Sequence, residues 1–498
     1  MNNQYILALD QGTTGSRAFL FDQKGSIVAS DYEEFKQYFP KPGWVEHDAE
    51  EIWRSCVNVI RGALKKSGIS SRRIAAIGIT NQRETTVLWD RKTGKPAARA
   101  IVWQCRRTAD ICRGVMHYAP TFRRKTGLVL DPYFSGTKIR WLLDNVQGLR
   151  ARARKGDICF GTIDSWLIWK LTDGRSHATD MTNASRTLIF NIRTLKWDSQ
   201  LLKILGIPPS VLPRVQNSGS IFGHTANVAG LPSGIPIASV LGDQQAALYG
   251  QGCYDAGTVK NTYGTGCFIV LNTGKKLILS KKGLLSTVAS DAQGRPIYAM
   301  EGSIFIAGAV IQWLRDQLGI VKESSETEKM IEGLKDTGGV YFVPAFTGLG
   351  APYWNPQARG MICGLTRGAG KGHITRAALE SIAYQTKDVF DIMKKEFPVR
   401  AAGRSPLRVD GGACRNNFLM QFQADILGCN IIRPKIIEST AFGAAQLAGV
   451  TIGLWKGKKE LNTLHKTGRI FKPQMKNKRR KELYQGWIKA VRQAQANG

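Results

Sequence analysis

Three short turns rich in glycine stand beside apolar, strand-like runs in this chain of 498 residues. They lie at residues 10–17, 260–266 and 410–413. Glycine lets a backbone approach a ligand closely, and a row of backbone N–H groups suits phosphate oxygens. Each turn alone is equally typical of an ordinary hairpin or helix start. Three compatible turns in one chain predict a phosphate-binding cleft that is assembled from dispersed loops.

The runs around the first turn indicate an α/β fold. Residues 5–32 alternate like a three-strand hairpin, residues 50–66 repeat apolar side chains at a helical period, and residues 74–80 are typical of a buried strand. A single hydrophobic core stops growing at ~250–300 residues, so a longer chain divides. Because the glycine turns start again after residue 250, we expect two domains, residues 1–250 and 251–498.

The net charge of +32 is the unusual part of the composition. Such a charge fits either nucleic-acid binding or solvated basic faces. The lysines and arginines form short scattered clusters, with neither zinc-finger spacing nor an RNA-recognition pattern of aromatics. We expect solvated faces, no nucleic-acid partner and electrostatic steering of anionic substrates such as ATP. A non-catalytic protein associated with nucleic acid is the alternative.

Cysteine usage and the apolar runs indicate a compartment. The nine cysteines are spread from Cys56 to Cys429 without a C-x-x-C pair, which is typical of reduced, mostly buried thiols. The first ten residues lack a cationic start, and the apolar run 304–311 is far shorter than the ~18 residues of a membrane span. We expect a cytoplasmic protein without a secretory leader or a transmembrane segment.

Two common ATP-binding patterns are missing. The P-loop pattern fails at residues 370–372, because a glycine follows Lys371 and Leu365 stands in place of the first glycine. The H-R-D and D-F-G signatures of protein kinases do not occur. Nucleotide binding is therefore expected at the three glycine turns.

The first turn is flanked by a carboxylate and a guanidinium. Asp10 precedes the turn and Arg17 follows it. The carboxylate could hold Mg²⁺ through water, and the arginine could bridge a transferring phosphoryl group. The third turn precedes a predicted helix over 416–427, and a helix N-terminus suits an adenine-ribose-phosphate group.

Candidate acceptor-binding residues follow two apolar strands. Asp243 follows the run 237–241, where it could take a proton from an alcohol or cap a helix. Arg83 and Glu84 follow the run 74–80, where they could hold hydroxyl groups or form a surface ion pair. Three aromatic residues could wall a small polyol or belong to the core: Trp103, Tyr133 and Phe268.

Seven segments are specific enough to identify a family. They are residues 9–14, 42–48, 78–85, 242–247, 261–268, 344–354 and 410–417. In these segments, and nearly end to end, the chain resembles the FGGY family of carbohydrate kinases. The run N-Q-R-E-T at 81–85 resembles the segment that holds glycerol in the glycerol-phosphorylating members, and the pentulose-phosphorylating members do not share it.

The resemblance implies the ribonuclease H-like superfold of actin and hexokinase, with two α/β domains and a cleft between them for ATP and substrate. It implies transfer of the γ-phosphoryl group of ATP to glycerol, which gives sn-glycerol 3-phosphate and ADP, with Mg²⁺ as the metal. It also implies a homo-oligomer, either a dimer or a tetramer.

The resemblance further implies roles for individual residues. The positions that match glycerol-holding groups are Arg83, Glu84, Tyr133, Asp243 and Gln244, with Asp243 as the base toward the attacking hydroxyl and Trp103 and Phe268 as an apolar wall. The positions that match nucleotide-holding groups are Thr13, Thr14, Gly15, Arg17, Thr265, Gly308, Gln312, Gly412 and Asn416. Asp10 matches the residue that meets Mg²⁺ through water.

Some positions depart from the family pattern. Gly15 stands where members usually carry serine, so we expect weaker nucleotide contact through the missing hydroxyl. The segment 227–234 lacks the glycine-rich, arginine-ending loop that binds fructose 1,6-bisphosphate in some members, and it lacks the histidine that others have phosphorylated. Neither control is expected here. The resemblance assigns no role to the basic stretch 472–481.

Overall fold

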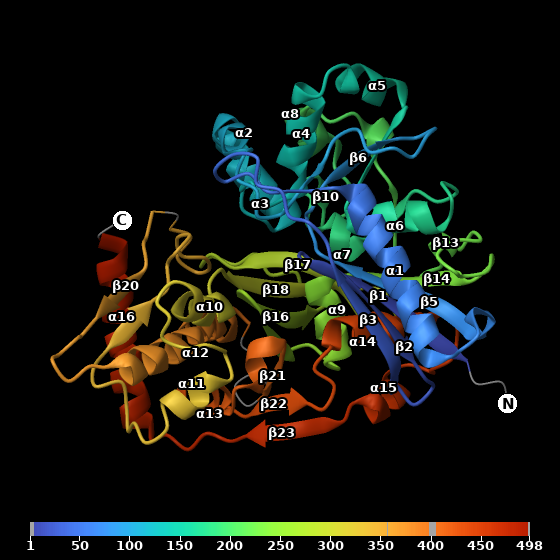
Figure 1. The fold of residues 1–498 in the computed structure, drawn as a ribbon. Helices are drawn as coiled ribbons and strands as arrows, with labels where there is room; N and C mark the ends of the chain where they lie inside the picture. Colours follow the sequence, from blue (N-terminus) through green and yellow to red (C-terminus); the bar gives the residue numbers. More distant parts are fainter. Residues whose placement is uncertain (1–3, 356, 398–404, 497–498) are drawn as a thin grey trace.

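The chain begins with a hairpin extended by a third strand, as predicted. In the computed structural model, which describes residues 4–355, 357–397 and 405–496, β1 and β5 lie at the centre of a six-stranded sheet (Figure 1). Its order is β13-β14-β5-β1-β2-β3, with β1, β5 and β14 parallel to one another. The strands are β1 (Tyr5–Gln11), β2 (Gly15–Phe21), β3 (Ile27–Glu34), β5 (Ile74–Asn81), β13 (Gly223–His224) and β14 (Pro236–Gly242).

The second sheet repeats the first. Its order is β17-β18-β16-β15-β21-β22-β23. The hairpin β15–β16 corresponds to β1–β2, and the parallel strands β21 and β22 correspond to β5 and β14. This duplication confirms the α/β prediction. The strands are β15 (Val259–Tyr263), β16 (Cys267–Gly274), β17 (Leu285–Ser290), β18 (Pro296–Ile304), β21 (Leu407–Asp410), β22 (Ile431–Pro434) and β23 (Thr467–Phe471).

Both faces of the first sheet are covered by helices. One face carries α1 (Ala49–Ser67), which confirms the predicted helix, and the other carries α9 (Asp243–Gly250) and α14 (Ser439–Thr451). Alternate residues of β1 belong to two different apolar cores. A strand that is buried on both sides has a continuous apolar run, because its side chains alternate between the two faces.

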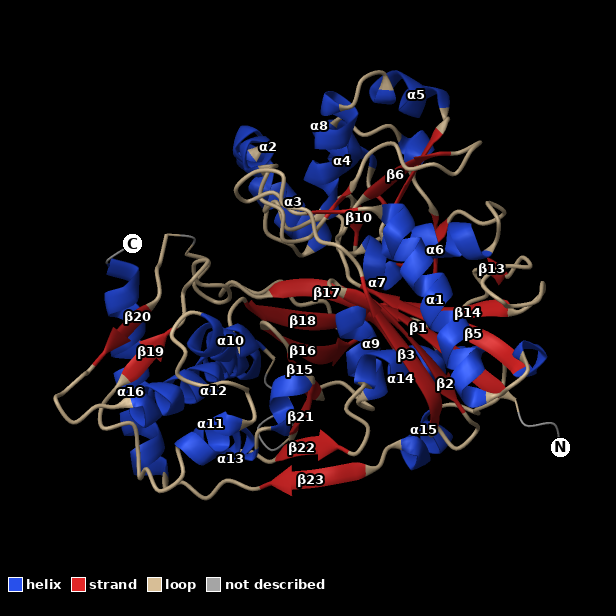
Figure 2. Cartoon of the chain, in the orientation of Figure 1, coloured by secondary structure: helices blue, strands red, loops and turns tan. Residues whose placement is uncertain are grey.

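The helices α9 and α14 lie between the two sheets (Figure 2). They cross at glycines, because a Cβ on Gly250 would overlap the carbonyl oxygen of Ser439 and a Cβ on Gly443 would overlap that of Ala246. Although α14 comes late in the chain, it packs on β1, β5 and β14 of the first sheet. The division of the chain into two domains at residue 250 therefore stays a proposal.

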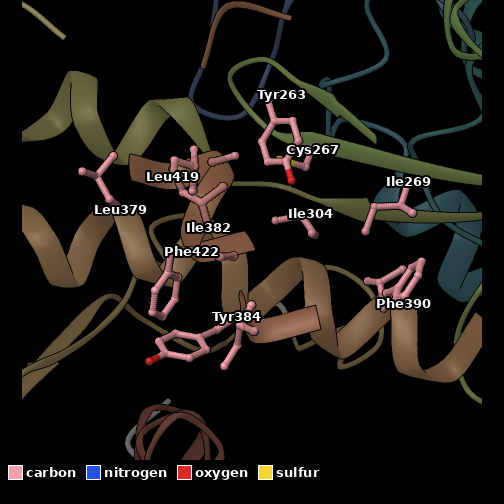
Figure 3. Packing of buried hydrophobic residues seen from close by; sticks show 14 of the residues in the cluster. Tyr263, Cys267, Ile269, Ile304, Leu379, Ile382, Tyr384, Phe390, Leu419 and Phe422 are labelled. Carbon is pink, nitrogen blue, oxygen red and sulfur yellow. The ribbon is translucent and has the colours of Figure 1, made fainter. Parts of the chain in front are cut away.

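The second sheet is covered by α12 and its neighbours. Side chains from β15, β16 and β18 meet those of α12 and α13 in one apolar core (Figure 3). The predicted helix over 416–427 is α13, and Asn416 is its N-cap. The helices here are α10 (Gly308–Asp316), α11 (Glu326–Met330), α12 (Lys371–Glu396), α13 (Asn417–Leu427) and α16 (Asn477–Ala496), with the antiparallel pair β19 (Tyr341–Val343) and β20 (Met361–Cys363). The helix α15 (Lys458–Leu464) packs instead in the core that the first sheet shares with α14.

Between β5 and β13 the chain builds a lobe of short elements, at the top of Figure 1. The lobe has its own apolar core. Its helices are α2 (Ala109–Gly114), α3 (Ala119–Thr126), α4 (Ser135–Asn145), α5 (Leu149–Lys155), α6 (Ile163–Leu171), α7 (Met181–Ala184) and α8 (Ser199–Leu205). Its strands are β6 (Val87–Asp90), β7 (Ala100–Ile101), β8 (Ile158–Gly161), β9 (Ala178–Asp180), β10 (Phe190–Asn191), β11 (Lys196–Trp197) and β12 (Arg214–Gln216), and β7 pairs with β4 (Glu46–His47).

All nine cysteines are free thiols, of which eight are buried and Cys363 is half-buried, as predicted. Within the three described stretches, none of the helices combines the length and the apolar character needed to cross a membrane.

Candidate active site

The three parallel strands of the first sheet end at the same edge. In their register Asp10 lies opposite Thr80, and Thr80 lies opposite Leu241. Parallel strands bring the residues that follow them to one place. The first glycine turn, the segment after β5 and the start of α9 are therefore neighbours, although they are far apart in the sequence.

Asp243 is the first residue of α9, and its side chain does not cap the helix. The N-cap residue is Gly242, so the alternative that Asp243 is the N-cap of this helix is wrong. The Asp243 carboxylate instead accepts hydrogen bonds from the Gln244 backbone N–H at 2.7 Å and from Gln244 Nε2 at 3.0 Å. Its Oδ1 lies 3.1 Å from Arg83 Nε, and its side chain is 32% exposed. Asp243 is thus oriented by neighbours while remaining open to solvent.

Arg83 and Glu84 are buried, so the alternative of a surface ion pair is wrong. Each side chain is only 2% exposed. Glu84 has a φ of 62°, a left-handed conformation that is uncommon for a non-glycine residue. Its carbonyl oxygen accepts hydrogen bonds from Ser135 Oγ at 3.0 Å and Lys138 Nζ at 3.1 Å. The fold therefore holds Glu84 in a conformation that costs free energy, which is typical of functional sites.

Two further charged residues complete this region. Glu301 of β18 binds both terminal nitrogens of Arg83, at 2.6 and 3.1 Å. Arg186, which follows α7, donates from Nη2 to Glu301 at 2.9 Å and from Nε to Glu84 at 2.6 Å. Burial alone would raise the pKa of Glu301, but the Arg186 and Arg83 guanidiniums outweigh it and lower the pKa to about 2. Glu301 is therefore an anion at any physiological pH.

Gln244 is held from the second sheet. Lys260 of β15 donates to Gln244 Oε1 at 2.6 Å and to Thr262 Oγ1 at 2.7 Å. Burial lowers the pKa of Lys260 to about 8, and the charges of Asp410, Asp243 and Glu301 oppose this shift. A single lysine therefore connects the acceptor-side glutamine to the strand that leads into the second glycine turn.

The three aromatic residues gather at one place, and none of them is fully buried. The Trp103 ring lies 5.6 Å from that of Tyr133 and 6.5 Å from that of Phe268, both edge to face. The Arg83 guanidinium lies 6.0 Å from the Phe268 ring centre. Half-exposed aromatic faces next to polar groups suit a ligand with both CH and OH groups. The arrangement favours the alternative that these aromatic residues line a ligand site over the alternative that they belong to the hydrophobic core.

The first glycine turn touches this wall directly. It closes with a hydrogen bond from Gly12 N to Gly15 O at 2.9 Å. Trp103 Nε1 donates to Thr13 Oγ1 at 2.9 Å, so the turn and the aromatic wall share a contact. Thr14 is exposed at the tip of the turn. The residues predicted for phosphate and those predicted for the acceptor are therefore adjacent.

Asp10 lies among other charges. Burial raises the pKa of Asp10 to about 7, Arg17 opposes this shift, and Glu438 and Asp243 add to it. Arg17 Nη1 pairs with Glu438 Oε2 at 3.0 Å, so its guanidinium bridges to the C-terminal part of the chain. In the described parts of the chain, no group of three or more Asp, Glu, His or Cys side chains could hold a metal. Mg²⁺ fits a lone carboxylate, because it usually keeps several waters and binds substrate phosphates.

The second glycine turn is also closed by a backbone hydrogen bond, across one residue fewer than the first. Gly264 N donates to Gly266 O at 2.9 Å. The Thr265 carbonyl oxygen accepts from the N–H groups of Ala307 and Ala309, so the turn is fastened to the start of α10. Gly308 donates to Gly264 O at 3.0 Å, and a Cβ there would lie 2.6 Å from that oxygen. Gln312 is exposed one turn further along α10.

The third turn lies beside the second. Gly411 has a φ of 84°, and a Cβ there would overlap the Tyr263 carbonyl oxygen. Gly412 is exposed with open space where a Cβ would be. Asn416 accepts from the Leu419 N–H at 2.8 Å as the N-cap of α13, and its amide nitrogen donates to Thr327 Oγ1 at 3.1 Å. The structure thus gives Asn416 a capping role that the sequence did not predict.

Five charged residues that make contacts in this site were not predicted from the sequence: Lys138, Arg186, Lys260, Glu301 and Glu438. Glu301 could have been found from the sequence, because it is a single carboxylate inside the run 296–304, whose other residues are typical of a buried strand. A charged side chain in a buried strand is rarely found without a partner of opposite charge. Its partners, Arg83 and Arg186, are more than a hundred positions away, and only the fold brings them together.

Comparison with known proteins identifies a family. The FGGY family of carbohydrate kinases matches with its N-terminal domain over residues 5–250 and with its C-terminal domain over residues 259–452. The glycerol kinase 2 of Thermotoga maritima is 55% identical over 491 residues, which cover 98% of both chains. The glycerol kinase of Bacillus subtilis is 55% identical over 494 residues, which cover 99% of both chains.

A solved structure agrees as well. The crystal structure of Plasmodium falciparum glycerol kinase with ADP has a TM-score of 0.91 at 37% identity, and the match covers 99% of this chain and 98% of that one. A ligand-bound xylulose kinase of Lactobacillus acidophilus, at 23% identity and a TM-score of 0.85, shares the fold. The ribonuclease H-like superfold of actin and hexokinase is thereby confirmed, and the chain belongs to the FGGY family of carbohydrate kinases.

Proposed function

We propose that this protein is an ATP:glycerol 3-phosphotransferase, which transfers the γ-phosphoryl group of ATP to glycerol and releases sn-glycerol 3-phosphate and ADP. The observation that carries the proposal is the contact between Trp103 and Thr13, because it joins a polar, aromatic-walled acceptor site to a phosphate-binding turn. Relatives that are 55% identical over 98–99% of both chains are named glycerol kinases, which supports the same substrate.

The chain's own residues divide the work on the acceptor. Arg83, Glu84, Tyr133 and Gln244 hold the hydroxyl groups of glycerol, while Trp103 and Phe268 face its CH groups. Asp243 accepts the proton from the terminal hydroxyl as its oxygen bonds to the γ-phosphorus and the bond to the ADP oxygen breaks. The contacts from Arg83 and Gln244 fix the Asp243 carboxylate for this proton transfer.

The nucleotide lies along the three glycine turns. Backbone and hydroxyl groups of Thr13, Thr14, Gly15 and Thr265 meet the phosphates, and Arg17 offers its charge to the transferring group. Gly308, Gln312, Gly412 and Asn416 flank the nucleoside. Asp10 would hold Mg²⁺ through water, and the metal would supply positive charge to the phosphate oxygens. ADP bound to the Plasmodium falciparum relative supports ATP as the donor.

The test is glycerol-dependent ADP release by the purified protein with Mg-ATP. We expect turnover of glycerol in preference to dihydroxyacetone and a panel of pentuloses. Asp243→Asn should lower kcat by about 10²- to 10⁴-fold, because general-base catalysis contributes that much. The matched control is Asp255→Asn, whose carboxylate pairs with Lys458 on the surface, and it should retain wild-type turnover.

Each outcome has a defined meaning. Full turnover by Asp243→Asn would refute the role of base, and no turnover of glycerol by the wild type would refute the proposed substrate. A cytoplasmic location, which rests on the scattered free cysteines, belongs to the same proposal. So does a homo-oligomer, either a dimer or a tetramer, which rests on the family resemblance.

A further inference from the structure

Four fully or almost fully buried side chains form an ion cluster behind the acceptor site: Arg83, Glu84, Arg186 and Glu301. Each is at most 2% exposed. Arg83 and Glu84 carry the proposed contacts to glycerol, whereas Arg186 and Glu301 have no part in the proposed chemistry. The question is what these two residues do there.

Glu301 occupies the centre of the cluster. Its Oε2 lies 2.6 Å from Arg83 Nη1, and its Oε1 lies 3.1 Å from Arg83 Nη2 and 2.9 Å from Arg186 Nη2. A two-point contact fixes the plane of a guanidinium as well as its position. Arg83 Nε remains for Asp243 at 3.1 Å. The carboxylate of Glu301 therefore sets the orientation of the Arg83 guanidinium, and with it the direction of the Nε–H group.

The same carboxylate acts on Glu84 through Arg186. Arg186 connects Glu301 to Glu84, with 2.6 Å between its Nε and Glu84 Oε1. Glu84 has a left-handed backbone, which persists only where the surroundings enforce it. The contacts thus form one chain from Asp243 through Arg83, Glu301 and Arg186 to Glu84.

Glu301 is the member of the cluster that comes from the second sheet. It lies on β18, whereas Arg83, Glu84 and Arg186 precede residue 250 and belong to the first sheet or its lobe. The acceptor-binding side chains are therefore oriented from across the junction between the two sheets.

Stability alone is a poor explanation for this arrangement. Well-packed apolar side chains can replace a buried ion cluster with little loss of stability or with a gain. Arg186 Nη1 is moreover buried without a hydrogen-bond partner in the described stretches, which is a cost. A cluster that carries such costs next to a ligand site is better explained by orientation of the ligand-binding groups.

We propose that Glu301 is a positioning residue for the acceptor: through its contacts with Arg83 and Arg186, the C-terminal sheet sets the geometry of the glycerol-binding side chains. The proposal rests on the proposed function for the identity of the acceptor. It predicts that loss of the Glu301 charge damages acceptor recognition and leaves nucleotide recognition intact.

The test compares Glu301→Gln with the wild type in the glycerol-dependent assay, with KM measured separately for glycerol and for ATP. Glutamine keeps the size of the side chain but cannot hold two guanidiniums by charge. We expect KM for glycerol to rise by about 10- to 100-fold and KM for ATP to change by less than about twofold. Arg186→Lys, which keeps the charge but loses the second contact, should show a smaller shift in the same direction.

The matched control is Glu380→Gln. Glu380 is also a buried carboxylate of the C-terminal part, paired with Arg376 at 2.9 Å on α12 and bonded by the Tyr384 hydroxyl. It should lose as much thermal stability as Glu301→Gln while it keeps the wild-type KM for glycerol. An equal rise of that KM in both variants would assign the effect to general destabilisation and overturn the proposal.

Three further outcomes are separable. If Glu301→Gln does not fold, the charge-balanced pair Glu301→Gln with Arg186→Gln should fold and still show the raised KM for glycerol. An unchanged KM for glycerol in a folded variant would refute the positioning role. A wild type that does not phosphorylate glycerol would refute the proposed function instead, and the wild-type measurement is made first for this reason.

Discussion

Gly15 lies at the end of the first glycine turn, and its surroundings suit glycine. A Cβ there would lie 2.7 Å from the Glu33 carbonyl oxygen of β3 and 2.8 Å from the Tyr32 hydroxyl. The backbone of β3 cannot yield easily, because it is paired with β2 along its length. Tyr32 and the backbone of Glu33 therefore crowd any side chain placed at position 15.

At the residue scale we predict that Gly15→Ser destabilises this protein. Overpacking of this kind typically costs about 1–3 kcal/mol of the free energy of unfolding. Adding Tyr32→Ser should restore part of the loss, since it removes the ring that crowds the site. Urea denaturation of both variants, with Tyr32→Ser alone as the control, measures the effect. A Gly15→Ser variant as stable as the wild type would contradict the predicted crowding.

At the scale of elements, the crossing of α9 and α14 joins the two sheets. Asp243, the first residue of α9, lies in the acceptor site, and α14 covers the strands that carry Asp10 and Asn81. The helices approach closely because Gly250 and Gly443 lack side chains at the crossing. The position of α9, which carries the proposed base Asp243, thus depends on a contact between backbones.

We predict that Gly443→Ala lowers both stability and activity. The new methyl group would overlap the Ala246 carbonyl oxygen, so α9 must move, and the loss should be about 1–3 kcal/mol of the free energy of unfolding. The control is Gly114→Ala at the end of α2, where no atom lies within 4 Å of the new Cβ. Thermal unfolding and kcat would be measured for both. Equal unfolding temperatures and equal kcat values in the two variants would show that the helix crossing can accommodate a methyl group.

At the scale of the whole molecule, 70 lysines and arginines face 38 aspartates and glutamates. Several basic side chains are neutralised locally, such as Arg150 by Asp144 and Arg152 by Asp90 on the lobe. The large remaining excess surrounds the molecule with a positive potential. ATP is strongly anionic and glycerol is uncharged, so the two substrates should respond differently to salt.

We predict that added NaCl raises KM for ATP and leaves KM for glycerol unchanged. Between roughly 20 and 500 mM salt, screening should raise KM for ATP by about 3- to 10-fold. Steady-state kinetics across this range provides the measurement, with glycerol as the internal neutral control. Parallel changes in the two KM values would mean that salt acts on the fold and that steering is not involved.

Many local elements of this protein could be predicted from the sequence alone. The period-2 run of β1–β3, the helical period of α1, the strand before Asp243 and the helix after Asn416 were all predictable, because each depends on neighbours within a few residues. The glycine turns were visible for the same reason, since a close backbone approach needs glycine wherever the rest of the chain lies.

Only the tertiary structure decided which partners these residues have. Adjacent Arg83 and Glu84 read equally well as a surface pair, and their burial against Glu301 and Arg186 follows from strands that meet across two sheets. Asp243 was equally compatible with a helix N-cap, but the N-cap is Gly242 and the Asp243 carboxylate contacts Arg83 and Gln244. The physical reason is range: periodicity and turn chemistry act over a few residues, whereas the desolvation of a charge and its compensation depend on groups that only the folded chain brings together.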